Sequence, residues 1–363
     1  MKITQLKAAS FKLKTGIKKI GANPIEMSYI PVVIVGIYTD DGINGFCATV
    51  YITSGNVLVR YLKEVIEPLL IGEDPFYIEK INEKLMTMTY NNQKATSMLR
   101  ANGIIDISLW DIIGKKLNTP IAYLLGCYNN KVKAYASTAE WKDPEVLAKD
   151  AVNFKEKGFK AIKLRVGRPK LEDDIKVVKT VRDAVGDEMV LWVDANRSYS
   201  RKNALKLAHI FYEYGIRSIE EPLNPEDTEG YEELCKKSPI SIAAGENLLT
   251  LMQWKNMIQA KALDIMQPWP TQCGGISGMK KLCGLAEIFG KDIEPHSGLM
   301  VAESIQVMCS TPNCSYVMWS IAQEKIREAL FEEPITPKDG YFVLNNKPGL
   351  GIKIKSEYLE KLE

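Results

Sequence analysis

The spacing of apolar positions changes once along the chain, close to Lys131, and each spacing predicts a different architecture. Before that point, residues 27–50 form two apolar or alternating runs joined by Asp-Asp-Gly, which predicts two strands and a hairpin turn. Residues 56–72 and 95–117 carry apolar side chains at helical spacing, with Gly or Pro near their ends, which predicts helices. We therefore predict an N-terminal α+β capping domain over residues 1–125.

Short apolar strands alternate with amphipathic, helix-length segments over residues 126–333. Such alternation is typical of parallel α/β folds, and eight repeats favour a barrel over an open sheet. Residues 334–363 contain two further strand-like pieces around turns, and we expect this C-terminal segment to return to the capping domain. The eight predicted barrel strands lie within residues 132–137, 159–167, 189–196, 216–222, 239–247, 263–269, 291–298 and 314–320.

Three consecutive barrel strands end in an acidic residue, and these residues are Asp194, Glu220 and Glu246. A strand buried on both faces is normally apolar throughout, so a charge at its end has left the core for the C-terminal rim, where barrel enzymes have their active sites. Three carboxylates that meet there repel one another unless a cation neutralises them, and hard oxygen ligands favour Mg²⁺ over Zn²⁺. The alternative is that each acid caps the following helix.

Composition narrows the class of protein. The chain has 363 residues, 46% of them hydrophobic and 25% charged, and a formal charge of +2. Without a basic stripe we expect no nucleic-acid partner, and without a signal peptide or an apolar run of ~20 residues we expect no membrane partner. The seven cysteines form no CxxC pair, so neither disulfides nor a zinc site are expected. These features predict a globular, cytoplasmic protein.

Several motifs together resemble those of the enolase superfamily, in its mandelate racemase/muconate lactonizing enzyme type. They are IIDISLWDIIGKKLNTPIAYLLG, AIKLRVG, LWVDAN, IEEP, AGEN, GGISG, EPHSG and PGLGI, and the resemblance covers the whole chain. It implies a modified TIM barrel, (β/α)7β, beneath an α+β capping domain. It also implies that Asp194, Glu220 and Glu246 bind Mg²⁺, and that a small-molecule carboxylate loses its α-proton through an enediolate intermediate. Losing that proton puts a second negative charge on the same oxygens, so a nearby cation is needed.

Lys163 and Arg165 alternate with apolar residues in AIKLRVG, so both side chains point to the same side of a strand, into the barrel mouth. By resemblance, Lys163 matches the residue that holds the substrate carboxylate. Arg165 stands where many relatives carry a lysine base. Because arginine rarely releases its proton, we assign Arg165 to hydrogen bonding or charge stabilisation, with a base or a plain salt bridge as alternatives.

His296 in EPHSG matches the histidine base of the family, and the other histidine, His209, lies in a helical pattern as a structural or surface residue. Relatives that use this base commonly orient it with an aspartate at the end of the sixth strand, where this chain has Trp269. An indole cannot accept a proton or pair with an imidazolium as a carboxylate does. Gln267 and Glu303 are candidates to orient His296 instead. The alternative is that His296 is a capping or core residue.

Four further residues are candidates for substrate binding. Trp269 and Trp319, on the sixth and eighth strands, would make the mouth aromatic, with ordinary packing as the alternative. Asn196 follows Asp194 in LWVDAN, and Tyr51 lies in the second of two cap segments, residues 14–29 and 49–55, that close the barrel in this family. A core position is an equal alternative for Tyr51.

These features predict dehydration of an acid sugar to a 2-keto-3-deoxy acid by a Mg²⁺-dependent lyase. A racemase, epimerase or cycloisomerase acting on a carboxylate or lactone is the first alternative, and a racemase needs two bases that Arg165 and an unpaired His296 supply poorly. A non-catalytic carboxylate-binding protein is the second alternative. By analogy with relatives, we expect a homo-oligomer.

Overall fold

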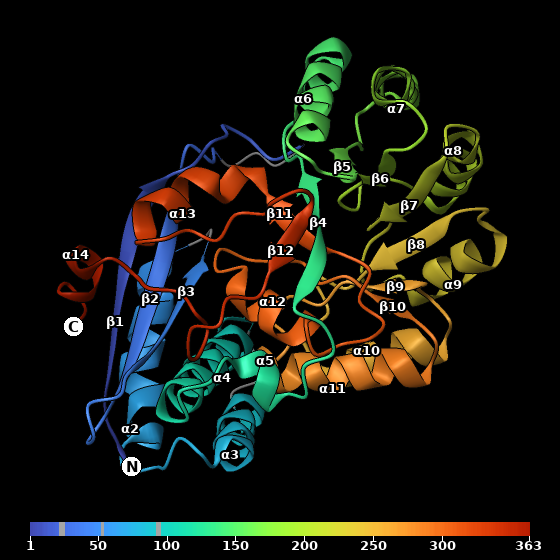
Figure 1. The fold of residues 1–363 in the computed structure, drawn as a ribbon. Helices are drawn as coiled ribbons and strands as arrows, with labels where there is room; N and C mark the ends of the chain where they lie inside the picture. Colours follow the sequence, from blue (N-terminus) through green and yellow to red (C-terminus); the bar gives the residue numbers. More distant parts are fainter. Residues whose placement is uncertain (22–25, 52–53, 92–95) are drawn as a thin grey trace.

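The computed structural model describes residues 1–21, 26–51, 54–91 and 96–363. Its capping domain holds a three-stranded antiparallel sheet in the order β1-β2-β3, with helices packed against it (Figure 1). The strands are β1 (Ile3–Lys14), β2 (Tyr29–Thr39) and β3 (Gly45–Val50). The helical elements are α1 (Gly55–Tyr61), the π-helical turn η1 (Leu62–Ile66), α2 (Glu67–Leu70), α3 (Ile78–Asn91), α4 (Thr96–Lys116) and α5 (Ile121–Leu124).

The predicted hairpin is β2 and β3, and Gly42, with φ of 79°, lies in the turn between them. β2 is the central strand and is almost entirely buried, as its continuous apolar run indicates. β1 and α3 were not predicted. β1 is a half-exposed edge strand in which buried and exposed positions do not alternate cleanly, so its sequence carries little strand signal.

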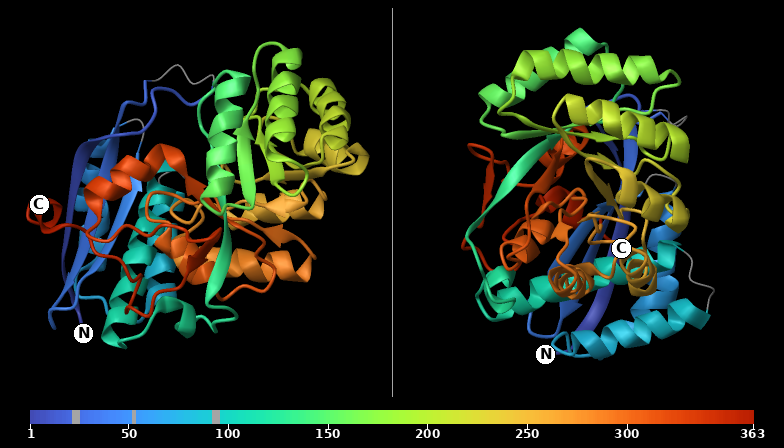
Figure 2. Two further views of the ribbon diagram at one scale, coloured as in Figure 1. Left: turned by 45° about the horizontal axis from the view of Figure 1, so that its top comes forward. Right: turned by 90° about the vertical axis from the view of Figure 1, so that its right-hand side faces the viewer.

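All eight predicted barrel strands are present, and they form a curled parallel sheet (Figure 2). Its order is β10-β9-β8-β7-β6-β5-β4-β11, and an isolated bridge between Ile293 and Cys314 joins the two ends. The mixed α/β fold class predicted from the sequence is confirmed. The strands are β4 (Lys131–Ser137), β5 (Ala161–Arg165), β6 (Val190–Asp194), β7 (Ile216–Glu220), β8 (Ser241–Ala244), β9 (Ile265–Met266), β10 (Asp292–Ile293) and β11 (Val317–Ser320).

Helices surround the curled sheet and bury its outer face (Figures 1 and 2). Their apolar stripes face inward, as in α7, where Val177, Val178 and Val181 are buried. These elements are α6 (Pro144–Glu156), α7 (Leu171–Val185), α8 (Arg201–Glu213), α9 (Thr228–Lys237), α10 (Leu251–Gln259), α11 (Gly275–Ile288), α12 (Ala302–Met308), the 3₁₀ turn η2 (Ile321–Gln323) and α13 (Glu324–Leu330).

Helix α4 joins the capping domain to the rim of the barrel. A Cβ on Gly103 would lie 2.5 Å from the carbonyl oxygen of Thr271, so only glycine allows the helix to cross the β9–α11 loop this closely. Next to that crossing, the buried Asp106 accepts a 3.0 Å hydrogen bond from the backbone N–H of Ser277. These contacts hold α4 against the barrel mouth.

The C-terminal segment contacts both domains. β12 (Tyr341–Val343) pairs antiparallel with β4, and the ring of Tyr358 in α14 (Ser356–Leu359) lies 5.1 Å from that of Phe11 in β1. The segment therefore reaches the capping domain, as expected, but only after it has added a strand beside the barrel.

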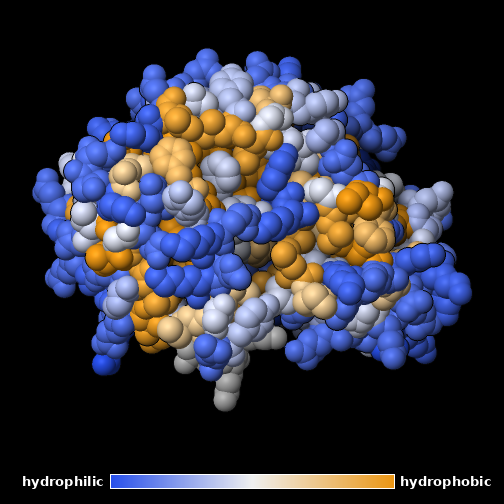
Figure 3. Space-filling model, turned by 90° about the horizontal axis from the view of Figure 1, so that it is seen from below, coloured by the Kyte–Doolittle hydropathy of each residue, from blue (hydrophilic) through white to orange (hydrophobic). Residues whose placement is uncertain are grey.

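No helix in residues 1–21, 26–51, 54–91 and 96–363 is both long and apolar enough to cross a membrane. Figure 3 shows one face of the molecule, on which hydrophobic residues form several patches separated by hydrophilic ones. The homo-oligomer stays a prediction.

Candidate active site

The three acidic residues lie at the ends of neighbouring barrel strands. Asp194 and Glu220 are the last residues of β6 and β7 and are paired in register. Glu246 follows β8, after Gly245, whose φ is 133° and whose Cβ would lie 2.0 Å from a ring atom of Trp254. Only glycine fits at that position, and the chain can therefore turn there and bring Glu246 to the same rim.

Lys163 and Arg165 extend from β5 toward these carboxylates. Nζ of Lys163 lies 2.5 Å from Glu220 Oε1 and 3.1 Å from Asp194 Oδ2, and Nη1 of Arg165 lies 2.8 Å from Asp194 Oδ1. Both cationic side chains are buried, and the ring of Tyr135 lies 5.9 Å from the Lys163 ammonium. The alternation read from the sequence therefore matches the side-chain directions on β5.

Burial and mutual repulsion perturb the acids of this cluster. Burial, together with the charges of Asp194 and Glu246, outweighs the attraction of Lys163 and raises the pKa of Glu220 to about 7. For Asp194, burial is outweighed by Arg165 and Lys163, which lower its pKa. Burial alone would lower the pKa of Lys163, but the neighbouring carboxylates raise it, so this lysine is charged at neutral pH. The raised pKa of Glu220 shows that the nearby cations do not fully offset the burial and mutual repulsion of these carboxylates, so a further positive charge would stabilise their ionised forms.

The donor set fits Mg²⁺ by its chemistry, because it offers three carboxylates on adjacent strands whose charges act on one another. In the described residues, however, no group of three His, Cys, Asp or Glu side chains is arranged to hold a metal ion. Asp194 and Glu220 face the cations of β5, and Glu246 faces His296. Joint binding of one ion by these three side chains stays a prediction.

His296 lies just after β10, between a carboxylate and an indole. Its Nε2 is 2.8 Å from Glu246 Oε2, and its ring lies on that of Trp269 with centroids 4.6 Å apart and planes at 41°. Burial would raise the pKa of Glu246, but the charge and hydrogen bond of His296 lower it well below its usual range. A Cβ on Gly298 would lie 2.8 Å from Trp269 Nε1, so this glycine makes room for the indole.

Neither side chain considered for orienting His296 has a hydrogen bond to it. Gln267 donates from Nε2 to Glu220 Oε2 at 2.7 Å, and Oε2 of Glu303 has no partner in the described part of the chain. Nδ1 of His296 is likewise buried without a partner there. The expectation that Gln267 or Glu303 orients the ring is therefore wrong, and Glu246 and the indole of Trp269 contact it instead.

Two residues beside the acids support the rim. The backbone N–H of Asn196 donates to Asp194 Oδ1 at 2.9 Å, and Asn196 has φ of 43°, in the left-handed region. Glu221, the second acid of IEEP, also has a positive φ, 38°, and both its oxygens accept from Asn247 Nδ2 at 2.8 Å. Burial and the charge of Glu246 raise the pKa of Glu221 well above its usual range. The sequence analysis chose Glu220 from this pair of acids and gave Glu221 no role.

A cavity of about 360 Å³ lies above this cluster, between the barrel rim and the capping domain. Lys163, Arg165, Asn196, Glu246, Trp269 and His296 line it from the barrel. The cap segments expected to close the barrel contribute Thr15, Ile17, Ile20, Met27 and Val50. Residues 22–25 and 52–53 of those two segments lie outside the described residues.

Trp319 is not part of this cavity. Met318 and Ser320 of β11 line it, so the intervening Trp319 faces the other side of the strand, where its ring contacts Phe342 and Arg327. The assignment of Trp319 to substrate binding was therefore wrong, because strand alternation places it in the packing between β11 and β12.

Tyr51 is not among the described residues that line this cavity, and its ring centroid lies 5.4 Å from the guanidinium carbon of Arg100. Arg100 belongs to α4, lines the cavity and was not predicted. Helical spacing shows which residues of α4 share a face, but only the packing of the two domains shows which face meets the barrel.

Two family models match the chain. Residues 17–126 match the mandelate racemase/muconate lactonizing enzyme N-terminal domain, and residues 146–358 match the enolase C-terminal domain-like family. The chain is 30% identical to the L-talarate/galactarate dehydratase of Salmonella typhimurium, over 91% of this chain and 82% of that protein. Other similar proteins are named as cycloisomerases and racemases.

Solved structures resemble this protein over nearly its full length. A racemase from Streptomyces coelicolor A3(2) with bound magnesium has a TM-score of 0.93 at 27% identity, covering 99% of both chains. L-talarate dehydratase from Polaromonas sp. JS666, complexed with Mg and L-glucarate, has a TM-score of 0.91 at 28% identity, covering 100% of this chain and 97% of that one.

The fold, the acidic rim and these matches place the chain in the enolase superfamily, in its mandelate racemase/muconate lactonizing enzyme group. It is an enzyme of the dehydratase or racemase type, as predicted. The magnesium in both solved structures confirms the cofactor expected from the sequence.

Proposed function

We propose that this enzyme removes the proton α to the carboxylate of an acid sugar and expels the neighbouring hydroxyl group, giving a 2-keto-3-deoxy acid. The observation that carries the proposal is that Lys163, His296 and Glu246 line one cavity, while Lys163 also contacts Asp194 and Glu220 on the adjacent strands. The resemblance to L-talarate/galactarate dehydratase supports the choice of substrate class.

In this proposal, Asp194, Glu220 and Glu246 hold Mg²⁺. The ion supplies local positive charge for the substrate carboxylate, whose oxygens gain negative charge as the proton leaves. Lys163, buried and charged, binds and orients that carboxylate. The proposed intracellular site of action is the cytoplasm.

His296 moves protons in the proposed reaction. Its Nε2 faces the cavity beside Glu246, so it can take the C2 proton and then return it to the C3 hydroxyl as the C–O bond breaks and water leaves. The resulting enol then becomes the 2-keto product. Arg165 lies against Asp194 and acts by charge, because a paired guanidinium is a poor base. With one proton carrier, elimination is favoured over racemisation.

The experiment follows α-protons of sugar acids by NMR in D₂O with Mg²⁺, and detects 2-keto products with semicarbazide. We expect Mg²⁺-dependent keto product from the wild type. His296→Asn should lower the rate by about 10²- to 10⁴-fold, the usual contribution of general acid–base catalysis. His209→Asn, which changes the exposed histidine of α8, is the matched control.

Different failures have different meanings. Exchange with inversion at C2 but no keto product would make the enzyme an epimerase, and formation of a lactone or its opening would make it a cycloisomerase. Equal rates in His296→Asn and wild type would contradict the role of His296. Binding of sugar acids without exchange in any of them would support a carboxylate-binding protein.

A further inference from the structure

Arg100 is a buried cation without an acidic partner in the active-site cavity. Arg100 is 9% exposed and extends into the cavity from α4 of the capping domain. Lys163 and His296 line the same cavity from the barrel. No ion pair joins Arg100 to an acidic side chain in residues 1–21, 26–51, 54–91 and 96–363. Burial lowers its pKa only to about 10, so the guanidinium is charged at neutral pH.

The protein fixes the position of this guanidinium without neutralising it. Nη1 of Arg100 donates to the carbonyl oxygen of Val50 at 2.7 Å, and the rings of Trp269 and Tyr51 lie 4.8 and 5.4 Å from its central carbon. Its Nε has no hydrogen-bond partner in the described residues. An aspartate at position 269 would cancel the charge, whereas an indole orients it by a cation–π contact and leaves it available.

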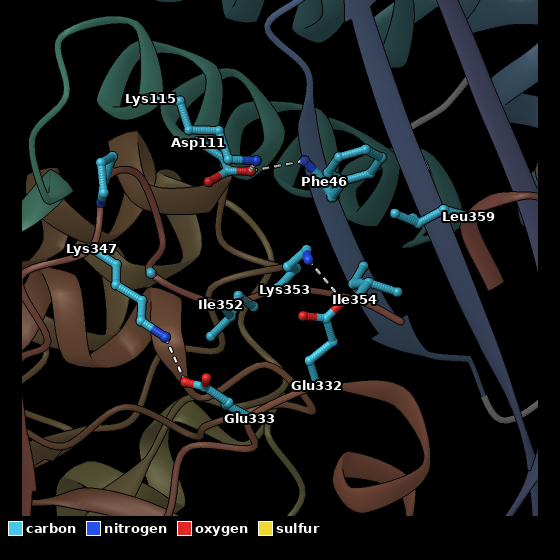
Figure 4. Close-up of a pocket in the computed structure, with 12 residues that line it drawn as sticks. Phe46, Asp111, Lys115, Glu332, Glu333, Lys347, Ile352, Lys353, Ile354 and Leu359 are labelled. Atoms are coloured by element: carbon cyan, nitrogen blue, oxygen red, sulfur yellow. Dashed lines mark hydrogen bonds and ion pairs between the residues drawn. The ribbon is translucent and has the colours of Figure 1, made fainter. Parts of the chain in front are cut away.

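Arg182 and Arg327 are also buried without an ion pair in the described residues, but they donate to backbone carbonyl oxygens and lie outside this cavity, whereas Arg100 lines it. In the same cavity, Lys163 faces Glu220 and Arg165 faces Asp194. A second cavity, of about 420 Å³, lies between β3, α4 and the C-terminal segment and also carries lysines (Figure 4). There, Nζ of Lys347 lies 2.5 Å from Glu333 and Nζ of Lys353 lies 2.9 Å from Glu332. Because these lysines already have acidic partners, they do not require an anionic ligand.

A buried charge without a partner is costly, since water is removed and nothing replaces it. A guanidinium presents its N–H donors in a planar fork that matches a carboxylate. At Arg100, Nη1 donates to the carbonyl oxygen of Val50 and two aromatic rings lie near the central carbon, while the other nitrogens have no hydrogen-bond partner in the described residues. The missing anion is therefore expected on the substrate.

We propose that Arg100 binds a second carboxylate of the substrate, so that this enzyme acts on dicarboxylic sugar acids, with Lys163 at the reacting end and Arg100 at the distal end. This inference rests on the proposed acid-sugar chemistry and names its substrate class. It also gives Trp269 a function: the indole holds both His296 and Arg100 in place.

The test compares matched pairs of six-carbon acids that differ only at the distal end: galactarate with galactonate, and glucarate with gluconate. We measure kcat/KM for the keto product and, separately, binding in the presence of Mg²⁺ by titration calorimetry. The variants are Arg100→Met, which keeps the stacking volume without the charge, and Arg100→Lys. Arg60→Met, at an exposed cap arginine paired with Glu64, is the control.

We expect the wild type to favour diacids, and Arg100→Met to lower the ratio of diacid to monoacid kcat/KM by about 10²-fold, as expected for losing a charge-assisted hydrogen-bonded pair. KM and Kd for the diacid should carry most of that change. Arg100→Lys should lose less, and it keeps the comparison possible if the Met variant does not fold.

The outcomes separate this inference from the proposed function. Equal losses for both members of a pair would show that Arg100 only supports Val50 and would overturn the inference. Turnover of monoacids in preference to diacids would overturn it while leaving the dehydratase intact. If no acid is turned over, the proposed function fails, and the binding measurements then test the anion site by themselves. Weaker diacid binding in Arg100→Met than in the wild type supports that site. No diacid binding in the wild type overturns it.

Discussion

Replacing Glu303 by glutamine should make the protein more stable, and increasingly so as the pH rises. Glu303 lies in the first turn of α12, is 1% exposed, and one of its carboxyl oxygens has no partner in the described residues. Burial raises its pKa from 4.5 to about 8, and its own backbone and the nearby Arg327 offset this only in part. Glutamine has the same shape and cannot ionise.

The sign and size of the effect follow from proton linkage. Because the fold favours the neutral carboxyl, the contribution of Glu303 to the free energy of unfolding is most favourable below pH 4.5 and falls as the pH rises toward 8. Each pH unit in that window lowers it by about 1.4 kcal/mol, and the total is on the order of 5 kcal/mol. Glu303→Gln lacks this loss, so its advantage over the wild type should grow through the window and stay constant above it.

The assay is urea unfolding of both proteins at pH 5, 6, 7 and 8, followed by circular dichroism, since other titrating groups cancel in the difference. Glu328→Gln, at an exposed carboxylate of α13, is the control. A difference between Glu303→Gln and wild type that does not change with pH would refute the reasoning. It would mean that Glu303 has a partner that stabilises its ionised form.

Three further predictions concern packing around the site. Gly298→Ala should displace the Trp269 indole, because the new methyl would lie 2.8 Å from its Nε1, and we expect a shift in tryptophan fluorescence with about a tenfold loss of kcat/KM. Gly103→Ala should lower the free energy of unfolding by about 1–3 kcal/mol, as measured in urea, because its methyl meets the Thr271 carbonyl at 2.5 Å; unchanged stability would mean that the helix shifts freely. Trp319→Phe should lower Tm while kcat/KM stays within about twofold, whereas Trp269→Phe should reduce kcat/KM, and the reverse pattern would contradict the assignment of the two tryptophans.

Much of the fold could be predicted because its signals are local. The barrel strands are short apolar runs separated by helical spacing, and all eight were located correctly. β1 was missed because an edge strand of a small sheet buries few of its side chains. The pairing of β12 with β4 could not be predicted, since it depends on a contact between residues about 200 positions apart.

The residues of the candidate site also differ in whether a local sequence signal indicates their position. Asp194 and Glu220 could be placed at the rim of the barrel because a charge at the end of a buried strand contradicts its apolar pattern. Trp319 was placed wrongly because all four residues of β11 are buried, and its short sequence, VMWS, does not show which positions face the barrel mouth. Arg100 was missed because its role depends on how α4 lies across the barrel, which helical periodicity does not encode.

The two paired strands β4 and β12 are synthesised far apart in time. The first barrel strand, β4, is complete by residue 137, but its antiparallel partner β12 is not synthesised until residues 341–343. The backbone N–H of Ala8 in β1 donates to the carbonyl of Glu363, which is synthesised later still. At translation rates of about 5–20 residues per second, both early strands remain without these partners for ten seconds or more. During that interval they are open edges, and a chaperone or a neighbouring nascent chain would meet them before the native partners do.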